Sequence, residues 1–295
     1  MRLIVKVCNF VSKLRKMEYL NLDQQFQPFG KSIEFYSFTF NGGEPHLKIK
    51  TAVLPTDIIT ITTRICAFND LGFLLLANDA LRRMGVRKIH LFLPYFPAAR
   101  QDRVMVKGEP LTVKIYANLI NNCQFETVTI VDPHSEVTAA VLDNVRVIDN
   151  HLFVKKCLEE IGNYQLISPD GGALKKVYKL ALFLGGKEVI ECSKRRDVNT
   201  GNLTDFAVYA DDLQGKTCVI VDDICDGGGT FLGLAAELKK KNAGELILVV
   251  THGLFSKGLE ELGKYFSKIY AMDSFSTIKS DFLTQIPLTD GLLSE

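Results

Sequence analysis

The 295-residue chain is predicted to be an α/β protein of two similar domains, each a mainly parallel sheet flanked by helices. Apolar strands alternate with helical segments along most of the chain, which is typical of a parallel sheet covered on both faces. The length suits two domains of ordinary size, and 47% hydrophobic residues can fill their cores. Several polar loops follow directly on apolar strands, at the edge where open α/β sheets bind ligands.

The first domain is expected over residues 1–150, with helices and strands in rotation. Gly85 stops its first helix and Pro110 opens its second, because glycine ends a helix and proline begins one at little cost. Pro94 ends the strand between them. The elements expected here are helices at 70–83 and 110–121 and strands at 89–93 and 127–131.

The second domain is expected over residues 151–295. The joint should fall near 149–155, although no Gly- or Pro-rich linker marks it. Helices are expected after Gly172 and after Thr230. The strands expected here are 164–167, 188–192, 217–221 and 246–250.

The net charge and the cysteine content limit the classes of binding partner and the cellular compartment that we expect. The net charge is +1, from 35 basic and 34 acidic residues, so no global basic field favours nucleic acid or an anionic membrane. Seven scattered cysteines without a Cys-x-x-Cys pair favour a reducing, cytoplasmic location. Residues 1–16 are interrupted by basic side chains, and we expect neither a signal peptide nor a membrane span. Any phosphate binding must therefore come from local loops.

The most informative segment is 219–230, where an apolar strand leads into three aspartates and a Gly-Gly-Gly-Thr run. Glycines let backbone N–H groups close around phosphate oxygens, and the helix expected over 231–241 directs its positive end at the anion. Asp222 and Asp223 can accept hydrogen bonds from the vicinal hydroxyls of a ribose. An ordinary strand-to-helix turn needs one glycine and an N-cap, but has no use for three carboxylates. The segment therefore predicts a sugar-phosphate site.

A second polar loop, 95–103, places two arginines and an amide beside aromatic residues. A guanidinium can stack on a purine face or bind phosphate oxygens in a bidentate manner. The alternative is a solvated charged loop with an apolar anchor. Alone, this loop does not decide between the two.

Carboxylates and a histidine after two further strands offer sparse ligands for a cation. Asp132 and His134 stand two residues apart, and Asp170 precedes Gly171 and Gly172, whose amides can face an anion. Mg²⁺ prefers few protein ligands together with waters and substrate phosphates, so such sites suit a metal carried on a nucleotide. The alternative is that His134 is a structural loop histidine.

Three consecutive cations, at 194–196, follow another strand and lead into a polar stretch at 198–204 that we expect to be a mobile loop. They form either a surface basic run or a flap that neutralises charge on a transferred phosphoryl group. No Ser–His or Cys–His pair stands in an obvious setting for acyl transfer. Phosphoryl transfer needs mainly positioning and charge neutralisation, which matches these residues.

On these motifs the chain, from about residue 40 to 275, resembles the ribose-phosphate pyrophosphokinases, whose two domains are phosphoribosyltransferase-like. Phe-Asn-Gly-Gly-Glu at 40–44 is similar to the family's nucleotide element. Arg-Gln-Asp-Arg at 100–103 is similar to its ATP loop, and residues 109–112 are similar to the start of the helix that follows this loop. Ser-Pro-Asp at 168–170 resembles the diphosphate loop. Residues 222–230 resemble the ribose-phosphate loop. The motifs are specific and span most of the chain.

The resemblance implies that the anomeric 1-hydroxyl of ribose 5-phosphate attacks the β-phosphorus of Mg-ATP, giving phosphoribosyl pyrophosphate and AMP. It also implies a homo-oligomer, dimer or hexamer, in which the nucleotide element is supplied across a subunit contact. The residues that it assigns are the catalytic Lys194 and Arg196; the Mg²⁺ ligands His134, Asp170 and Asp132; the ATP-binding Phe40, Gly42, Gly43, Glu44, Arg100, Gln101, Asp102 and Arg103; the ribose-phosphate-binding Asp222, Asp223, Asp226, Gly227, Gly228, Gly229 and Thr230; and the diphosphate-loop Asp170, Gly171 and Gly172.

The chain departs from the family pattern at three places. Gly42 replaces an aspartate of the nucleotide element, and Met-Val-Lys-Gly stands at 105–108, where basic residues usually lie, so adenine contacts and regulation by phosphate or ADP are not carried over. Gly227 stands where the ribose-phosphate loop has threonine, which removes a hydroxyl from the 5-phosphate. This motivates an alternative acceptor, a larger 5-substituted ribose such as ADP-ribose.

Two rival classes share parts of this pattern. A phosphoribosyltransferase carries a similar Asp-Asp loop, but the ATP loop and the basic triplet favour the kinase. A non-catalytic regulatory relative would keep the fold, but retention of Lys194, Arg196, His134 and Asp170 argues against it. We therefore expect a diphosphotransferase.

Overall fold

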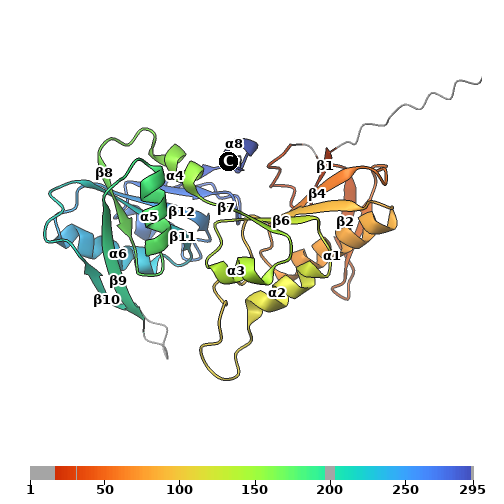
Figure 1. Cartoon of the computed structure of the whole chain (residues 1–295), viewed down its shortest axis with the longest axis horizontal. Coiled ribbons are helices and arrows are strands. Elements are labelled where there is room, and N and C mark those ends of the chain that lie inside the picture. The colour runs from red at the N-terminus through yellow and green to blue at the C-terminus, as the bar shows by residue number, and fades with distance from the viewer. Residues whose placement is uncertain (1–16, 31, 197–202, 294–295) are drawn as a thin grey trace, which may run out of the picture.

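The computed structural model describes residues 17–30, 32–196 and 203–293. Figure 1 shows a first half, coloured red to yellow-green, beside a second half, coloured green to blue. Within the described residues, no helix is both long and apolar enough to cross a membrane. The expected α/β class is confirmed, since each half contains a sheet of mainly parallel strands with helices against it.

The first half contains a five-stranded parallel sheet in the order β1-β4-β5-β6-β7. An antiparallel hairpin, β2–β3, stands apart from it and was not expected from the sequence. The elements are β1 (Met17–Asn21), β2 (Phe35–Thr39), β3 (Pro45–Ile49), β4 (Ile58–Thr62), α1 (Phe68–Arg83), β5 (Lys88–Phe92), α2 (Thr112–Asn121), β6 (Thr127–Val131), α3 (Glu136–Val141) and β7 (Val145–Ile148).

The second half contains a seven-stranded sheet in the order β10-β9-β8-β11-β12-β13-β14, in which only the β9–β10 pair is antiparallel. The elements are α4 (His151–Leu158), β8 (Tyr164–Ser168), α5 (Leu174–Phe183), β9 (Val189–Arg196), β10 (Leu203–Val208), β11 (Thr217–Cys225), α6 (Gly229–Lys240), β12 (Leu246–Gly253), α7 (Glu260–Gly263), β13 (Lys268–Met272), β14 (Thr284–Ile286) and α8 (Asp290–Leu293).

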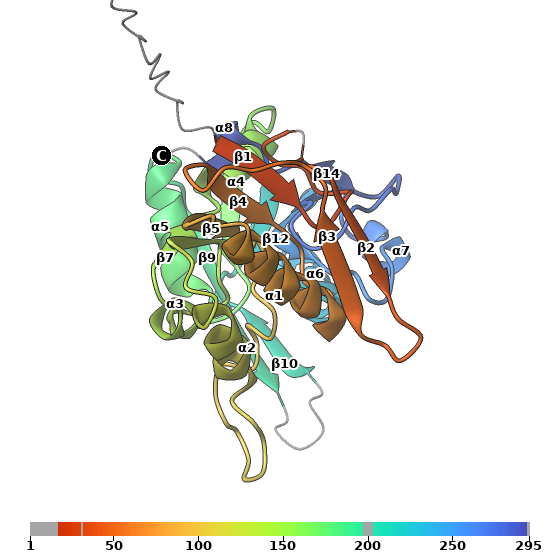
Figure 2. The same ribbon diagram turned by 90° about the vertical axis from the view of Figure 1, so that its right-hand side faces the viewer.

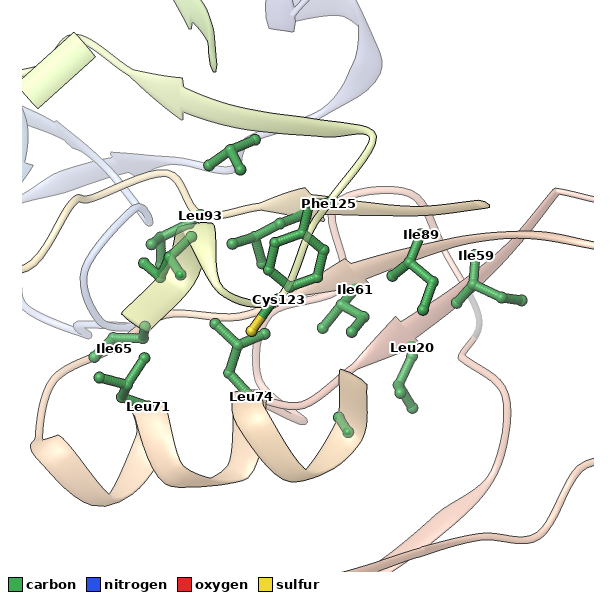
Figure 3. Packing of buried hydrophobic residues seen from close by; sticks show 14 of the residues in the cluster. Leu20, Ile59, Ile61, Ile65, Leu71, Leu74, Ile89, Leu93, Cys123 and Phe125 are labelled. Carbon is green, nitrogen blue, oxygen red and sulfur yellow. The ribbon is translucent and has the colours of Figure 1, made fainter. Parts of the chain in front are cut away.

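The core of the first half follows from helical and strand periodicity. Leu71 and Leu74 of α1 are fully buried and point toward the sheet that carries Ile59 and Ile61 of β4, which belong to the same apolar cluster (Figure 3). Residues three or four apart share one face of a helix, and alternate residues share one face of a strand. The apolar spacing that predicted this helix is therefore the spacing that buries it.

One apolar cluster joins the two halves. Phe92 and Val131, at the ends of β5 and β6, pack in the same cluster as Phe153 of α4 and Val249 of β12. All four are buried. Loops that follow strands in both halves are therefore held against one another, although the expected domain division at residue 150 stays a prediction.

Two strands run further than expected and carry site residues that were placed in loops. β11 continues to Cys225 because β12 pairs with it in parallel as far as Gly253, so Asp222 and Asp223 stand on the strand. β9 continues to Arg196 because β10 pairs with it across the sheet edge. The expected loop position of the basic triplet 194–196 was therefore wrong: these residues lie on a strand.

Candidate active site

The candidate site is built at the carboxyl ends of β5, β6, β8 and β11, where each strand gives way to a polar loop. The loops after β5 and β6 belong to the first half, and those after β8 and β11 to the second. Side-chain contacts join the loops after β5 and β6 to the end of β11 and the loop after it, and Lys194 of β9 joins the loop after β8 to Thr230. The arrangement matches the rule that open α/β sheets bind ligands at strand ends.

The ribose-phosphate loop closes directly into α6. Gly228 has φ +77°, a left-handed conformation that favours glycine, and it forms the N-cap of the helix. A Cβ at this position would also lie 3.2 Å from a methyl group of Leu262. Gly229 and Thr230 begin the helix, so its positive end and its first free amides face the loop.

Asp222 and Asp223 form an acidic pair at the end of β11. The backbone N–H of Asp223 donates to Oδ1 of Asp222 at 2.9 Å. Burial and the neighbouring charge raise the pKa of Asp222 well above its usual range. Burial also opposes ionisation of Asp223, but the His134 hydrogen bond and the charge of Lys176 outweigh it and lower its pKa. The two environments therefore push the pKa values of the pair apart, and Asp223 is the carboxyl that ionises more readily.

His134 brings the first half to this acidic pair. Its Nδ1 lies 2.7 Å from Oδ2 of Asp223, although 89 residues separate the two in sequence. The Asp223 side chain is 9% exposed and the His134 side chain 38%. One imidazole nitrogen is thus engaged by the acidic pair, and the ring keeps an exposed side.

The diphosphate loop is closed by Asp170. Its Oδ1 accepts hydrogen bonds from the backbone N–H groups of Gly172 at 2.8 Å and Ala173 at 3.0 Å. Its Oδ2 lies 2.7 Å from Nζ of Lys194. Burial opposes ionisation of Asp170, but Lys194 and the two amides lower its pKa overall. Gly171 has open space around it.

Lys194 links the diphosphate loop to the ribose-phosphate loop. Besides its ion pair with Asp170, its Nζ lies 3.3 Å from Oγ1 of Thr230. The Lys194 side chain is 19% exposed. Arg196 ends β9, but its side chain, with residues 197–202, lies outside the part of the chain that the structure describes. One of the two expected catalytic cations is therefore in place between the loops.

Arg100 makes a second contact between the halves. Its Nη2 lies 2.7 Å from Oδ2 of Asp226 in the ribose-phosphate loop, and Ser256 donates to the other oxygen of Asp226 at 2.6 Å. These contacts lower the pKa of Asp226, Ser256 contributing most. Gln101 is exposed beside Arg100. The ATP loop thus reaches the ribose-phosphate loop.

The rest of the ATP loop is less directly engaged. Asp102 is buried and accepts two hydrogen bonds from the guanidinium of Arg103, at 2.8 and 3.1 Å. Arg103 is exposed. This bidentate pair shapes the loop and occupies the face of Arg103 that a phosphate would otherwise bind.

Asp132 has contacts that favour a structural role over metal binding. It is 5% exposed, and its Oδ1 lies 2.9 Å from Nζ of Lys176. Its Oδ2 accepts hydrogen bonds from Thr251 and from Asn150, the latter at 3.0 Å. Lys176 also donates to the carbonyl of Pro133 at 2.7 Å. Both carboxylate oxygens are therefore occupied by protein donors.

The nucleotide element lies on the β2–β3 hairpin, away from α5 and β9 in both Figure 1 and Figure 2. Phe40 is 52% exposed, and its ring lies 4.6 Å from that of Phe38 and 5.8 Å from that of His46. Gly43 has φ +95° at the turn, and Gly42 and Glu44 complete it. Among the described residues, no hydrogen bond or ion pair connects this turn with the strand-end loops.

His252 is a residue of this region that the sequence did not reveal. It is 1% exposed near the end of β12, and its Nε2 lies 3.0 Å from the carbonyl of Val131. Its Nδ1 lies 2.8 Å from Oγ of Ser274, and the ring of Tyr95 packs against it. Burial lowers the pKa of His252, which favours the neutral ring. Its only signal in the sequence was a polar end, Thr-His-Gly, on an apolar strand.

The donor set suits a magnesium ion bound mainly by substrate. Among the described residues, no group of three or more His, Cys, Asp or Glu side chains is placed to hold a metal. Asp170 and His134 each present one partly exposed side chain near the acidic pair. Mg²⁺ accepts one or two protein ligands and completes its shell with waters and phosphates, so these residues fit it.

A wider cavity of about 670 Å³ lies elsewhere, beside the segment 277–287 and Gln25. It shares no residue with the contacts above. A small cavity does lie among them, lined by Asp132, Lys176, Asp222 and Asp223. The converging charged groups, rather than cavity size, therefore define the candidate site.

Two family models match the chain: the N-terminal domain of ribose phosphate pyrophosphokinase over residues 31–123, and the phosphoribosyl transferase domain over 142–279. The ribose-phosphate pyrophosphokinase of Thermosipho africanus is 34% identical over 247 residues, covering 80% of this chain and 77% of the relative. That of Mycoplasma pneumoniae is 32% identical over 224 residues, covering 74% and 67%.

Solved structures show the same fold. A phosphoribosylpyrophosphate synthetase from Mycobacterium smegmatis superposes with a TM-score of 0.80 over 93% of this chain and 95% of that chain, at 21% identity. The expectation of two phosphoribosyltransferase-like domains is thereby confirmed. The chain belongs to the ribose-phosphate pyrophosphokinase family.

Proposed function

We propose that the protein transfers the β,γ-diphosphoryl group of Mg-ATP to the 1-hydroxyl of ribose 5-phosphate, giving phosphoribosyl pyrophosphate and AMP. The observation that carries this is Lys194, whose ammonium contacts Asp170 of the diphosphate loop and Thr230 of the ribose-phosphate loop. A cation between a sugar-phosphate loop and a diphosphate loop lies on the path of a transferred diphosphoryl group. Curated relatives named ribose-phosphate pyrophosphokinase favour this acceptor over ADP-ribose.

The acceptor binds through the ribose-phosphate loop in this proposal. Ionised Asp223 accepts a hydrogen bond from one ribose hydroxyl, and Asp222 forms a hydrogen bond with the neighbouring hydroxyl. His134 and Lys176 keep Asp223 charged when the sugar is absent, so no rearrangement of charge is needed on binding. The 5-phosphate binds amides of 227–229 at the positive end of α6.

The cations act on the donor nucleotide. Arg100 leaves Asp226 to bind ATP phosphates, and Lys194 moves from Asp170 to the diphosphoryl group as its charge shifts toward the leaving AMP. Because the Arg100–Asp226 pair is partly exposed, exchanging its carboxylate for a phosphate costs little. Arg196 is proposed to join Lys194 from the adjoining strand end.

Mg²⁺ is the proposed cofactor. The residues that would hold it are His134 and Asp170, with the substrate phosphates and waters completing the shell. Bound there, the ion would neutralise charge on the phosphate oxygens. Asp132 has a positioning role in the proposal, because its contacts with Lys176 and Thr251 hold the loop that carries His134.

The exposed turn with Phe40 and Glu44 supports a homo-oligomer in which one copy completes the nucleotide site of another. Co-refolding or subunit exchange between two inactive variants, Phe40→Ala and Lys194→Ala, tests this. Hybrid oligomers would contain some sites with both residues intact, and activity should return. Activity that stays at the level of the separate variants would rule out the shared site.

A division near residue 150 and a reducing, cytoplasmic location also remain proposals. Six cysteines lie in the described residues, all free and all but Cys66 buried, which supports a reduced state. The catalytic proposal itself is tested by supplying ATP, Mg²⁺ and ribose 5-phosphate without a nucleobase. AMP formation that depends on the sugar phosphate supports the kinase, whereas ATP left unconsumed until a nucleobase is added would support a phosphoribosyltransferase.

A further inference from the structure

The departure at Gly227 is accompanied by a second side chain in the same space. A Cβ built on Gly227 would lie 3.3 Å from Cδ and 3.4 Å from Cε of Lys257. The backbone of Gly227 is not in the left-handed region, so its conformation does not require glycine. Glycine at this position instead leaves room for the aliphatic part of the Lys257 side chain, which lies over it.

Lys257 is held beside the loop by the chain before it. The backbone N–H of Leu254 donates to the carbonyl of Cys225 at 2.8 Å, and that of Ser256 to the carbonyl of Asp226 at 3.1 Å. The Ser256 hydroxyl also donates to Asp226. The segment after β12 therefore runs along the ribose-phosphate loop, and the root of the Lys257 side chain is well positioned.

The Lys257 ammonium is a cation available to a ligand. Among the residues that the structure describes, no hydrogen bond or ion pair engages it, and the residue is exposed. The nearby charge of Asp226 is already compensated by Arg100 at 2.7 Å and by the Ser256 hydroxyl at 2.6 Å. Nζ lies one bond beyond Cε, so it stays near Gly227.

We propose that Lys257 binds the 5-phosphate of the acceptor, its ammonium taking over from the hydroxyl that a threonine at position 227 would supply. The inference rests on the proposed function and names a specificity residue for the same site. A hydroxyl donates one neutral hydrogen bond, whereas an ammonium pairs with charge. The phosphorus attached at C5 carries up to two negative charges in ribose 5-phosphate but only one in ADP-ribose, whose second charge lies on the next phosphorus, so Lys257 favours ribose 5-phosphate.

Lys257→Met removes the charge and keeps the length of the stem. We expect about a tenfold rise in the KM for ribose 5-phosphate, the low end of what a charge-assisted hydrogen bond contributes. The kcat and the KM for ATP should change less than about twofold, because Lys257 does not contact the transferred group in this proposal. The matched control is Lys264→Met, since Lys264 already pairs with Glu261 at 2.6 Å and should leave both KM values unchanged.

Binding of ribose 5-phosphate without ATP, followed by calorimetry, gives a readout apart from turnover. Affinity should fall with added salt in the wild-type protein and fall less steeply in Lys257→Met. Lys257→Arg should keep the affinity within about threefold. If far-UV circular dichroism shows that Lys257→Met does not fold, Lys257→Gln tests the same loss of charge with a polar side chain.

The double variant Gly227→Thr with Lys257→Gly replaces the proposed lysine contact with the threonine hydroxyl of the family pattern. Removal of the lysine clears the space for the threonine, so the KM for ribose 5-phosphate should recover to within about threefold of the wild type. An active wild-type enzyme whose KM and affinity for ribose 5-phosphate are unchanged in Lys257→Met and Lys257→Gln would overturn the inference. A wild-type protein that forms no AMP would instead overturn the proposed function.

Discussion

Replacement of Asp132 with alanine removes an acceptor shared by three donors, two of which belong to the second half. These are Lys176 at 2.9 Å, Asn150 at 3.0 Å and the hydroxyl of Thr251. Each hydrogen bond to a charged group contributes about 1.5 to 3 kcal/mol. Lys176 keeps the carbonyl of Pro133 and is 41% exposed, so its ammonium can be rehydrated. The loss of the other two bonds should lower the free energy of unfolding by about 3 kcal/mol.

The variants Asp132→Ala and Asp132→Asn separate loss of the group from loss of its charge. The amide keeps the volume and one acceptor oxygen, and should cost about 1 to 2 kcal/mol. Urea unfolding followed by far-UV circular dichroism measures both, since the chain has no tryptophan. Asp79→Ala is the control: its pair with Arg83 is between exposed side chains and should contribute less than about 0.5 kcal/mol.

If the free energy of unfolding of Asp132→Ala lies within about 0.5 kcal/mol of the wild-type value, the structural role of this carboxylate is contradicted. The magnesium dependence provides a second criterion. Asp132→Asn should leave the Mg²⁺ concentration for half-maximal activity unchanged, because protein donors occupy both oxygens. A rise in that concentration would identify Asp132 as a metal ligand instead.

Three further predictions concern the ion pairs of the site. Lys194→Ala should lower kcat by about 10²-fold or more with an unchanged far-UV spectrum; activity near the wild-type level, measured as AMP release, would refute its role. Arg100→Leu should raise the KM for ATP by about tenfold yet change stability by less than about 1 kcal/mol, since both partners are partly exposed; an unchanged KM would exclude ATP binding. The lowered pKa of Asp223 adds stability that is complete above its unfolded value, about 3.9, and is lost as pH falls through the folded value. Asp223→Asn should therefore flatten the acid limb of the stability curve, and an equally steep limb would contradict the assignment.

Local patterns predicted much of the fold, and pairing between distant segments supplied the rest. The strand expected at 127–131 is β6, and the helix expected at 70–83 is α1 with two more residues at its start. β9 and β11 run further because neighbouring strands extend their ladders, which no local signal in 188–196 or 217–225 could reveal. The β2–β3 hairpin was missed since its polar turn resembles an ordinary loop.

In the candidate site, too, the features that are local in sequence could be predicted, and the contacts between distant segments could not. Asp222 to Thr230 could be found because carboxylates, glycines and a helix start are adjacent in sequence. The partners of these groups could not be found from the sequence, because His134 and Asp223 are 89 residues apart in the chain and Arg100 and Asp226 are 126 residues apart. Lys257 gave no signal, because its role depends on the space above Gly227 in the folded chain. Spatial convergence is therefore what the structure adds to the motifs.

The central claim is that a diphosphoryl group passes from ATP to a ribose phosphate at the strand-end site that contains Lys194 and Asp222. It is tested most directly with ATP labelled at the β-phosphorus, in the presence of Mg²⁺ and ribose 5-phosphate and without a nucleobase. The account predicts that the label moves into the sugar product and that one unlabelled AMP forms for each product molecule. Label retained in ADP, with only the γ-phosphate transferred or released, would contradict it.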